Sequence, residues 1–244
     1  MVIIADIYPN ESMKEIKGKC DVSNCYLCNH CSKDWAIAIT SHKKNYEVKK
    51  GQHIFIEGEP VTRIYFVYSG KIKTHKRWDA EKELIIRFAK PGDILGHMGL
   101  GNEPVYPVTT TALENSVICS VDLAFFESSL NVNPKLTYSL MKLFANELQE
   151  SEKRMRNLVH MPVKERIALA LLNLKKQFGT TEDGYIDIEL SRQDLSSFAA
   201  VAYETLFKVM NEFQNSSLIA TNGKSIKLLN EAELKAMTID KVQL

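Results

Sequence analysis

The chain has 244 residues, a formal net charge of +1, 45% hydrophobic residues and 25% charged residues. This composition is typical of a soluble globular protein, and no apolar run reaches the length that would cross a bilayer. The near-zero charge gives no indication of a polyanionic partner, so composition alone does not point to DNA. The length suffices for two ordinary domains, or for one large domain with an appendage.

The N-terminal residues, MVIIADIYPN, include an apolar patch but neither a basic region nor a signal-peptide cleavage site. We therefore expect a cytoplasmic protein with no membrane partner. Four of the five cysteines lie in the next segment, as Cys20, Cys25, Cys28 and Cys31, and the fifth is Cys119. Because cytoplasmic thiols stay reduced, such a cluster binds metal more often than it forms disulfides.

Short β-rich runs separated by glycine occupy residues 46 to 125, which hold seven of the eleven glycines. The runs are HIFIEG, RIYFVYSGKIKTHK, ELIIRFAKPGDILG, VTTTAL and SVICSV. Short strands with glycine at the corners predict a small antiparallel barrel or jelly roll.

A long helix is predicted from Pro134, which suits a first helical turn, to about His160. Its apolar residues recur at intervals of three and four, and such a narrow seam on a long helix favours pairing with a second copy. The alternative is that the helix packs on its own barrel. The seam comprises Leu136, Leu140, Leu143, Phe144, Leu148, Met155, Leu158 and Val159.

The remaining pattern, from Pro162 to about Asn230, predicts a winged helix-turn-helix. A helix opens at Pro162 and stops at Gly179, and YIDIEL alternates as a strand. Two helical patterns follow, broken near residues 200–201, and a hairpin is expected at Asn222-Gly223, a dipeptide favoured by type I′ turns.

One face of the second of these two helices is apolar and predicts core packing, through Leu206, Val209, Met210 and Phe213. The opposite face presents Tyr203, Glu204, Phe207 and Lys208 near the helix N-terminus, where recognition helices meet base edges. Arg192, at the start of the preceding helix, is placed for a phosphate contact. The alternative is that these residues are ordinary solvated side chains. The net charge of −1 over residues 191–213 favours that alternative.

The chain after about residue 20 resembles the CRP/FNR superfamily of bacterial transcription regulators. The resemblance is carried by KKGQHIFIEGEPVTRIYFVYSGKIK, FAKPGDILGHMGL, VKERIALALLNL and SRQDLSSFAAVAYETLFKVMNEFQNSSLI. It implies an α+β fold with a cyclic-nucleotide-binding-like β-roll, a dimerisation helix and a C-terminal winged helix-turn-helix. The expected parts are a cysteine-rich segment (1–34), the β-roll (35–133), the dimerisation helix (134–160) and the DNA-binding domain (161–244).

The same resemblance assigns base readout to Glu204 and Lys208, with Phe207 in the family's variable position. Lys208 stands where the family has arginine, and Ala200 where the turn usually has glycine. Ala202 lacks the usual Ser or Thr cap. These departures concern the operator sequence more than DNA binding itself.

Cyclic-AMP-binding members place a Gly-Glu pair at the ribose and an Arg-Ser pair at the cyclic phosphate. This sequence has Gly96-His97 and Pro107-Val108 at those points. A buried phosphate without an arginine is unfavourable, so we expect no cyclic nucleotide. Haem on His97 or His75 is not favoured either, because a lone histidine is more often a surface or capping residue.

The cysteines predict an oxygen-sensitive [4Fe–4S] cluster, because Cys25, Cys28 and Cys31 have the spacing of bacterial ferredoxins. The resemblance implies Cys119 as the fourth ligand, with Cys20 as the local alternative, although oxygen-sensing members space their third cysteine farther from the second. Zinc could instead take these thiolates, or three of them with His30 or His42. The thiols could also carry no metal.

The sequence therefore predicts a dimeric, redox- or oxygen-responsive transcription regulator with a palindromic duplex DNA site and RNA polymerase as partners. The alternative from another class is an electron-transfer or zinc-stapled interaction module. No nucleophile elbow, phosphate-cradling glycine loop or paired-carboxylate motif indicates an enzyme.

Overall fold

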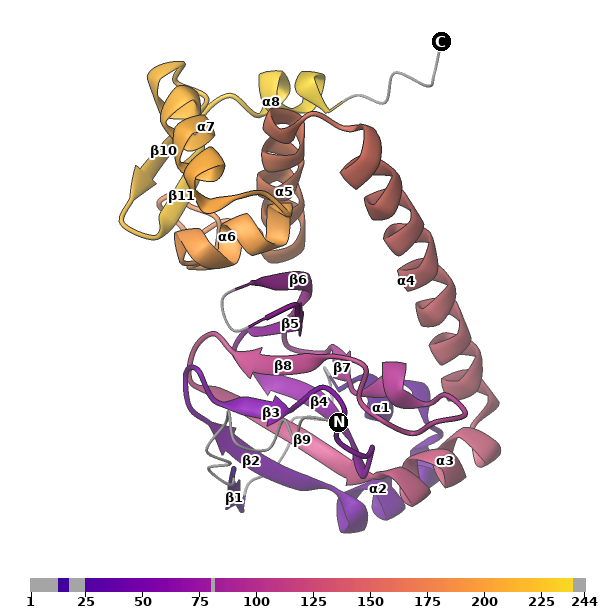
Figure 1. Cartoon of the computed structure of the whole chain (residues 1–244). Coiled ribbons are helices and arrows are strands. Elements are labelled where there is room, and N and C mark those ends of the chain that lie inside the picture. Colours follow the sequence, from indigo (N-terminus) through magenta and orange to yellow (C-terminus); the bar gives the residue numbers. More distant parts are fainter. Residues whose placement is uncertain (1–12, 18–24, 80–81, 239–244) are drawn as a thin grey trace. The chain divides into compact units, whose positions relative to one another are not determined.

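The computed structural model describes residues 13–17, 25–79 and 82–238 (Figure 1). The chain forms two compact units: residues 1–74 with 88–139, and residues 75–87 with 140–244. No helix in the described ranges is both long and apolar enough to cross a membrane.

The β-roll consists of two sheets, as the glycine-punctuated runs predict. One sheet has the strand order β1-β2-β9-β4-β7 and the other has the order β3-β8-β5-β6. Strand β9 lies between β2 and β4 and pairs antiparallel with both. The strands are β1 (Lys14–Ile16), β2 (Lys44–Val48), β3 (His53–Phe55), β4 (Arg63–Ser69), β5 (Ile72–Arg77), β6 (Glu83–Ala89), β7 (Ile94–Leu95), β8 (Thr109–Ala112) and β9 (Ser116–Asp122).

Gly70 shows why glycine is needed at a corner of the roll. It connects β4 to β5 with φ of 92°, and a Cβ atom at this position would lie 2.1 Å from the Ser116 Oγ. Any other residue would therefore have to displace strand β9.

Three helices of the N-terminal unit were not predicted from the sequence: α1 (Tyr26–His30), α2 (Ala36–His42) and α3 (Leu123–Val132). Helix α3 begins where β9 ends, because the Asp122 carboxylate accepts a hydrogen bond from the Phe125 amide at 2.8 Å. These helices are short, and so their apolar periodicity is too brief to be recognised in the sequence.

Helix α4 spans Pro134–His160, with the bounds that the sequence predicts. Its apolar residues form two stripes instead of one seam. Leu136 and Leu140 are buried within their own chain, so their assignment to an open seam was wrong. The outward stripe comprises Tyr138, Met141, Phe144, Leu148, Met155, Leu158 and Val159.

The C-terminal unit contains the predicted helices and hairpin. Helices α6 and α7 are separated at residues 200–202, and β10 and β11 pair antiparallel around Asn222 and Gly223. The described elements are α5 (Val163–Phe178), α6 (Arg192–Ala199), α7 (Tyr203–Asn215), β10 (Ile219–Asn222), β11 (Ser225–Leu228) and α8 (Glu231–Met237).

The strand predicted for residues 185–190 is wrong. Its alternating side chains Ile186, Ile188 and Leu190 are buried as expected, but the backbone forms no continuous ladder: Ile186 makes an isolated bridge to Thr180, and its amide donates to the Ile226 carbonyl of β11 at 2.8 Å. The alternation of apolar and polar residues thus identified the inward-facing side chains. A strand also needs a continuous ladder of backbone hydrogen bonds to a neighbouring strand.

Arg154 joins three elements of the C-terminal unit. Its half-buried guanidinium donates to the carbonyls of Ile86 at 2.6 Å, Ile85 at 2.7 Å and Phe198 at 2.8 Å. These carbonyls belong to β6 and α6, and the guanidinium also lies 5.4 Å from the centre of the Phe198 ring. The last turn of α6 is therefore held to the β5–β6 hairpin through α4.

The turn between α6 and α7 depends on a left-handed alanine. Ala200 has φ of 53° and ψ of 53°, a conformation in which its Cβ is crowded by the backbone. The Ala200 carbonyl accepts from Arg166 at 3.2 Å, and the Val201 amide donates to the Ser196 carbonyl at 3.0 Å. The surrounding contacts therefore enforce a conformation that glycine would adopt without strain.

Replacing Ala200 by glycine should stabilise the protein. Relief of left-handed strain contributes about 1–2 kcal/mol, and the added freedom of the unfolded chain removes about 0.4–1 kcal/mol. We expect the free energy of unfolding, measured by urea denaturation, to rise by about 0.5–1 kcal/mol. The control Ala199→Gly, in the last turn of α6, should lower it by a similar amount. A loss of stability in Ala200→Gly would contradict this account of the turn.

Candidate nucleic-acid interface and cysteine segment

One face of helix α7 is packed in the core of the C-terminal unit, and the opposite face is exposed to solvent. Leu206, Val209, Met210 and Phe213 are buried, as the periodicity predicts. The preceding helix α6 starts at Ser191, whose hydroxyl oxygen accepts from the Asp194 amide at 2.9 Å. These contacts fix α6 and α7 as a rigid pair that positions the opposite face of α7.

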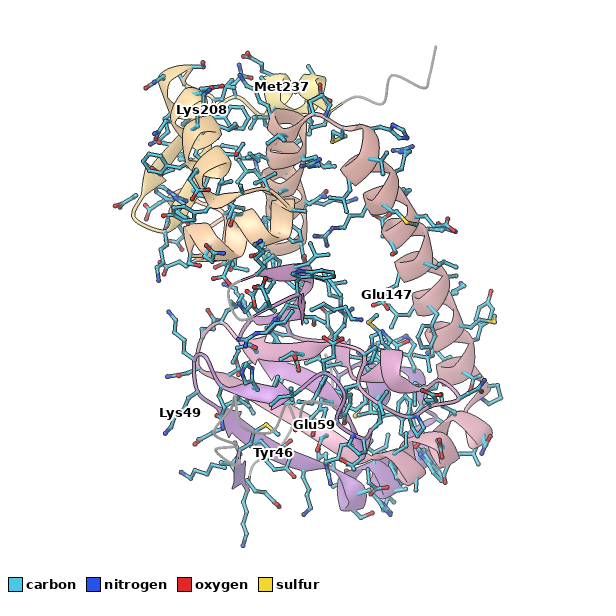
Figure 2. The ribbon with its side chains drawn as sticks, viewed as in Figure 1. Tyr46, Lys49, Glu59, Glu147, Lys208 and Met237 are labelled. Atoms are coloured by element: carbon cyan, nitrogen blue, oxygen red, sulfur yellow. The ribbon has the colours of Figure 1, made fainter. Side chains whose placement is uncertain are left out.

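The outward face of α7 brings together the residues predicted to read DNA. Tyr203, Glu204, Phe207 and Lys208 are all exposed, and they occupy the first two turns of the helix. Figure 2 labels Lys208 on this helix. Among the described residues, none forms a hydrogen bond or an ion pair with the side chains of Glu204 and Lys208. Their polar atoms are therefore available to base edges.

Arg192 has a structural contact that the sequence did not predict. Its guanidinium donates to the Gly223 carbonyl at 3.3 Å and so ties the start of α6 to the turn of the β10–β11 hairpin. Lys224 is exposed in the same turn. The hairpin thus adds a cation near the start of α6, where the phosphate contact is expected.

The three described N-terminal cysteines lie on or beside α1. Cys25 precedes the helix, Cys28 is inside it and Cys31 follows it, so their spacing is that of successive helical turns. Cys25 is buried, and the other two are half-buried. Burial, with a smaller contribution from Cys28, raises the pKa of the Cys31 thiol to about 11. This thiol is protonated at neutral pH when no metal is bound.

Cys119 is buried on β9, opposite Asn45 of β2 and Phe66 of β4. Within the described ranges, no three His, Cys, Asp or Glu side chains gather closely enough to hold a metal ion. The conformation described does not bring Cys25, Cys28, Cys31 and Cys119 together, and Cys20 lies outside the described residues. The donor set therefore does not fit an iron–sulfur cluster or a zinc ion in this conformation.

The two histidines that were considered as zinc ligands each form a hydrogen bond to a main-chain carbonyl of their own helix. His30 donates through Nδ1 to the Tyr26 carbonyl at 2.7 Å. His42 donates through Nδ1 to the Ala38 carbonyl at 2.9 Å, and its ring stacks on Phe125 at 4.1 Å. Each histidine thus has a structural role in the described conformation.

The cysteine segment is attached to the region where α4 begins. The Ser32 amide donates to the buried Asn133 side-chain oxygen at 2.8 Å, and the Trp35 indole donates to the Ser129 hydroxyl at 3.0 Å. Lys135, in the first turn of α4, donates to the Asn29 carbonyl at 3.3 Å. The partners are separated by 94 to 106 residues, so no local pattern could have predicted these contacts.

Comparisons with known proteins match both units. Residues 46–133 match the cyclic nucleotide-binding domain, and residues 165–237 match the Crp-like helix-turn-helix domain. The transcriptional activator protein anr of Pseudomonas aeruginosa is 31% identical over 198 residues, which are 80% of each chain. The chain belongs to the CRP/FNR family of transcription regulators.

A second relative and a solved structure are also similar to this chain. The fumarate and nitrate reduction regulatory protein of Vibrio cholerae is 28% identical over 223 residues, covering 88% of this chain and 87% of the relative. The solved structure of FixK2 from Bradyrhizobium japonicum matches with a TM-score of 0.73 and 22% identity, over 81% of this chain and 98% of that one. The CRP/FNR fold that the sequence predicts is confirmed. The prediction that the protein is a transcription regulator and not an enzyme is confirmed as well.

Aromatic rings lie beside the place where CRP/FNR proteins that bind cyclic AMP are expected to hold the ribose. A Cβ on Gly96 would lie 3.1 Å from the Tyr106 ring and 3.7 Å from the Phe55 ring. Tyr106 stacks on Phe55 at 4.0 Å and donates its hydroxyl to the Arg63 carbonyl at 2.7 Å. Burial raises the pKa of Tyr106, so this hydroxyl stays a donor at neutral pH.

The two histidines considered for haem are both buried in this CRP/FNR chain. His75 pairs through Nδ1 with the Glu83 carboxylate at 2.8 Å, within the β5–β6 hairpin. His97 lies in the short turn that follows Gly96. The Glu83 contact gives His75 a structural role.

Replacing Asn133 by alanine should loosen the cysteine segment. The change removes the acceptor of the Ser32 amide and one of the two donors to the Ser129 carbonyl, which keeps its bond from the Asn133 main-chain amide. We expect a loss of about 0.5–1.5 kcal/mol in the free energy of unfolding, together with faster hydrogen exchange in peptides covering residues 26–35. Asn146→Ala, at an exposed position of α4, is the control and should change neither. Unchanged exchange in Asn133→Ala would show that the segment is held by other contacts.

Proposed function

We propose that this CRP/FNR protein is a homodimer that reads a palindromic duplex operator through α7. The observation that carries the proposal is the exposed face of α7, where Glu204, Phe207 and Lys208 stand on a helix whose other face is fully packed. A carboxylate can accept from cytosine N4, and an ammonium can donate to guanine O6 or N7. Such a target would place the protein in the cytoplasm, with RNA polymerase as a further partner.

The base-reading assignment is tested by selecting binding sites from random duplex DNA. Lys208→Ala should relax preference at one base position in each half-site, because one base contact discriminates by about 1–3 kcal/mol. Arg192→Ala should weaken binding to all sequences about equally and reduce the salt dependence of affinity. Lys176→Ala, an exposed cation on α5, should leave the selected motif intact. Equal and sequence-independent losses in both variants would refute the division of roles.

The dimer is supported by the outward stripe of α4. Met141, Phe144, Leu148, Met155 and Leu158 follow the three-four spacing of a heptad repeat, and all are exposed in the single chain. Ser151 interrupts this stripe between Leu148 and Met155. Isolated exposed apolar residues are ordinary, whereas a heptad-spaced stripe over several helical turns is typical of a helix–helix interface.

Leu148→Glu should produce a folded monomer. Leu148 is 62% exposed in the single chain, so the charge leaves the fold of each chain intact but brings two carboxylates together in a paired seam. Light scattering should report half the mass, and operator affinity should fall because a palindrome needs two recognition helices. Asn146→Glu adds the same charge on the opposite side of the helix and should remain dimeric. If the Leu148→Glu protein remains dimeric, the dimer interface does not lie along this stripe of α4.

We also propose that the cysteine segment makes the regulator responsive to oxygen or redox state. The Vibrio relative is named as a regulatory protein of fumarate and nitrate reduction, which are redox processes. The bonds from Ser32 and Asn29 to the start of α4 would connect changes in the cysteine segment to the dimerisation helix.

Metal loading distinguishes the three predictions for the thiols. Because the described conformation does not gather the ligands, binding requires residues 25–31 to rearrange. Protein prepared without oxygen and with iron should be brown and contain about four irons per chain if a [4Fe–4S] cluster forms. Cys28→Ser should then be colourless. Colourless wild-type protein with one bound zinc would establish a structural zinc site, and protein with no metal would reject both.

A further inference from the structure

Two exposed aromatic side chains stand four residues apart on the outward face of α7. Tyr203 is 45% exposed and Phe207 is 56% exposed. Residues at this spacing are neighbours on one helix face, so the two rings form a single apolar patch. On the helix surface this patch lies beside the polar side chains of Glu204 and Lys208, which are one position further along from Tyr203 and Phe207.

An apolar patch on a recognition helix has a specific chemical complement. The edges of the four bases in the major groove are hydrogen-bond donors and acceptors, with one apolar exception, the 5-methyl group of thymine. Phe207 has no hydrogen-bonding group, so facing any other base edge would remove water from a polar group without replacing its hydrogen bond.

We propose that Phe207 packs against the 5-methyl group of a thymine in each half-site, with Tyr203 beside it. The inference rests on the proposed DNA-reading role of α7 and deepens it by assigning one base and one atom of that base. The family resemblance leaves this position variable, so Phe207 determines operator specificity in this chain in particular.

The position of this thymine follows from helix geometry. Glu204 and Phe207 are three residues apart, which is about 4.5 Å along the helix axis at 1.5 Å per residue. Stacked base pairs are about 3.4 Å apart. The thymine therefore lies within about one or two base pairs of the pair that Glu204 contacts, which we expect to contain cytosine.

The experiment removes only the methyl group. In the duplex selected by the wild-type protein, each thymine is replaced in turn by uracil, which keeps every hydrogen-bonding group. One position in each half-site should lose about four-fold in affinity, the factor that corresponds to burying one methyl group. Cytosine at the same position should bind more weakly still, and 5-methylcytosine should recover part of that loss.

Variants of Phe207 assign the effect to its ring. Phe207→Ser should bind thymine and uracil duplexes equally, while Phe207→Leu should keep part of the preference. Because the side chain is exposed, both variants should fold, which their melting temperatures will verify. The inference fails if wild-type protein binds its operator but ignores every uracil substitution, or if Phe207→Ser keeps the full methyl effect. If no duplex sequence is selected at all, the proposed DNA-reading role itself fails.

Discussion

The Arg154 guanidinium is the interaction on which the arrangement of the C-terminal unit depends. It donates to two carbonyls of β6 and one of α6, and its own backbone belongs to α4. Burial lowers the pKa of Arg154 but leaves an arginine charged, so three carbonyl oxygens compensate for the lost hydration. Nearby, Arg166 holds the carbonyl of Ala200, and the two arginines together fix the turn that sets the orientation of α7.

Helix α4 has residues in both compact units and forms bonds within each of them. Its first turn bonds to the cysteine segment through Lys135, and its fourth and last turns bond to elements of the C-terminal unit through Glu147 and Leu158. Glu147, labelled in Figure 2, pairs with Arg87 at 2.7 Å, and the Leu158 carbonyl accepts from Arg166 at 3.1 Å. Both sets of bonds are therefore made by one continuous helix, which also carries the outward apolar stripe.

The sequence predicted features that depend on local chemistry. Pro134 defined the start of α4, Gly179 the end of α5, and Asn222-Gly223 the hairpin, because each has a conformational preference that acts without tertiary partners. The outward face of α7 was also predictable. A helix with 3.6 residues per turn places Phe207 and Phe213 on different faces, whatever surrounds the helix.

Features that depend on distant partners were not predictable. Leu140 and Leu148 look alike in the periodicity of α4, and only the folded structure shows that Leu140 is buried in its own chain while Leu148 is exposed. The bond from Ser32 to Asn133 joins residues 101 positions apart. The alternation of residues 185–190 predicted the buried side chains correctly, but it could not report the missing partner strand.

The central claim is that two copies of α7 read two half-sites on one face of the duplex. Hydroxyl-radical footprinting of the protein on its selected operator tests this most directly, because it reports which sugars are covered on each strand. The account predicts two protected patches on each strand, related by two-fold symmetry and centred about 10–10.5 base pairs apart. A single continuous patch without symmetry, or protection that does not depend on the operator sequence, would contradict it.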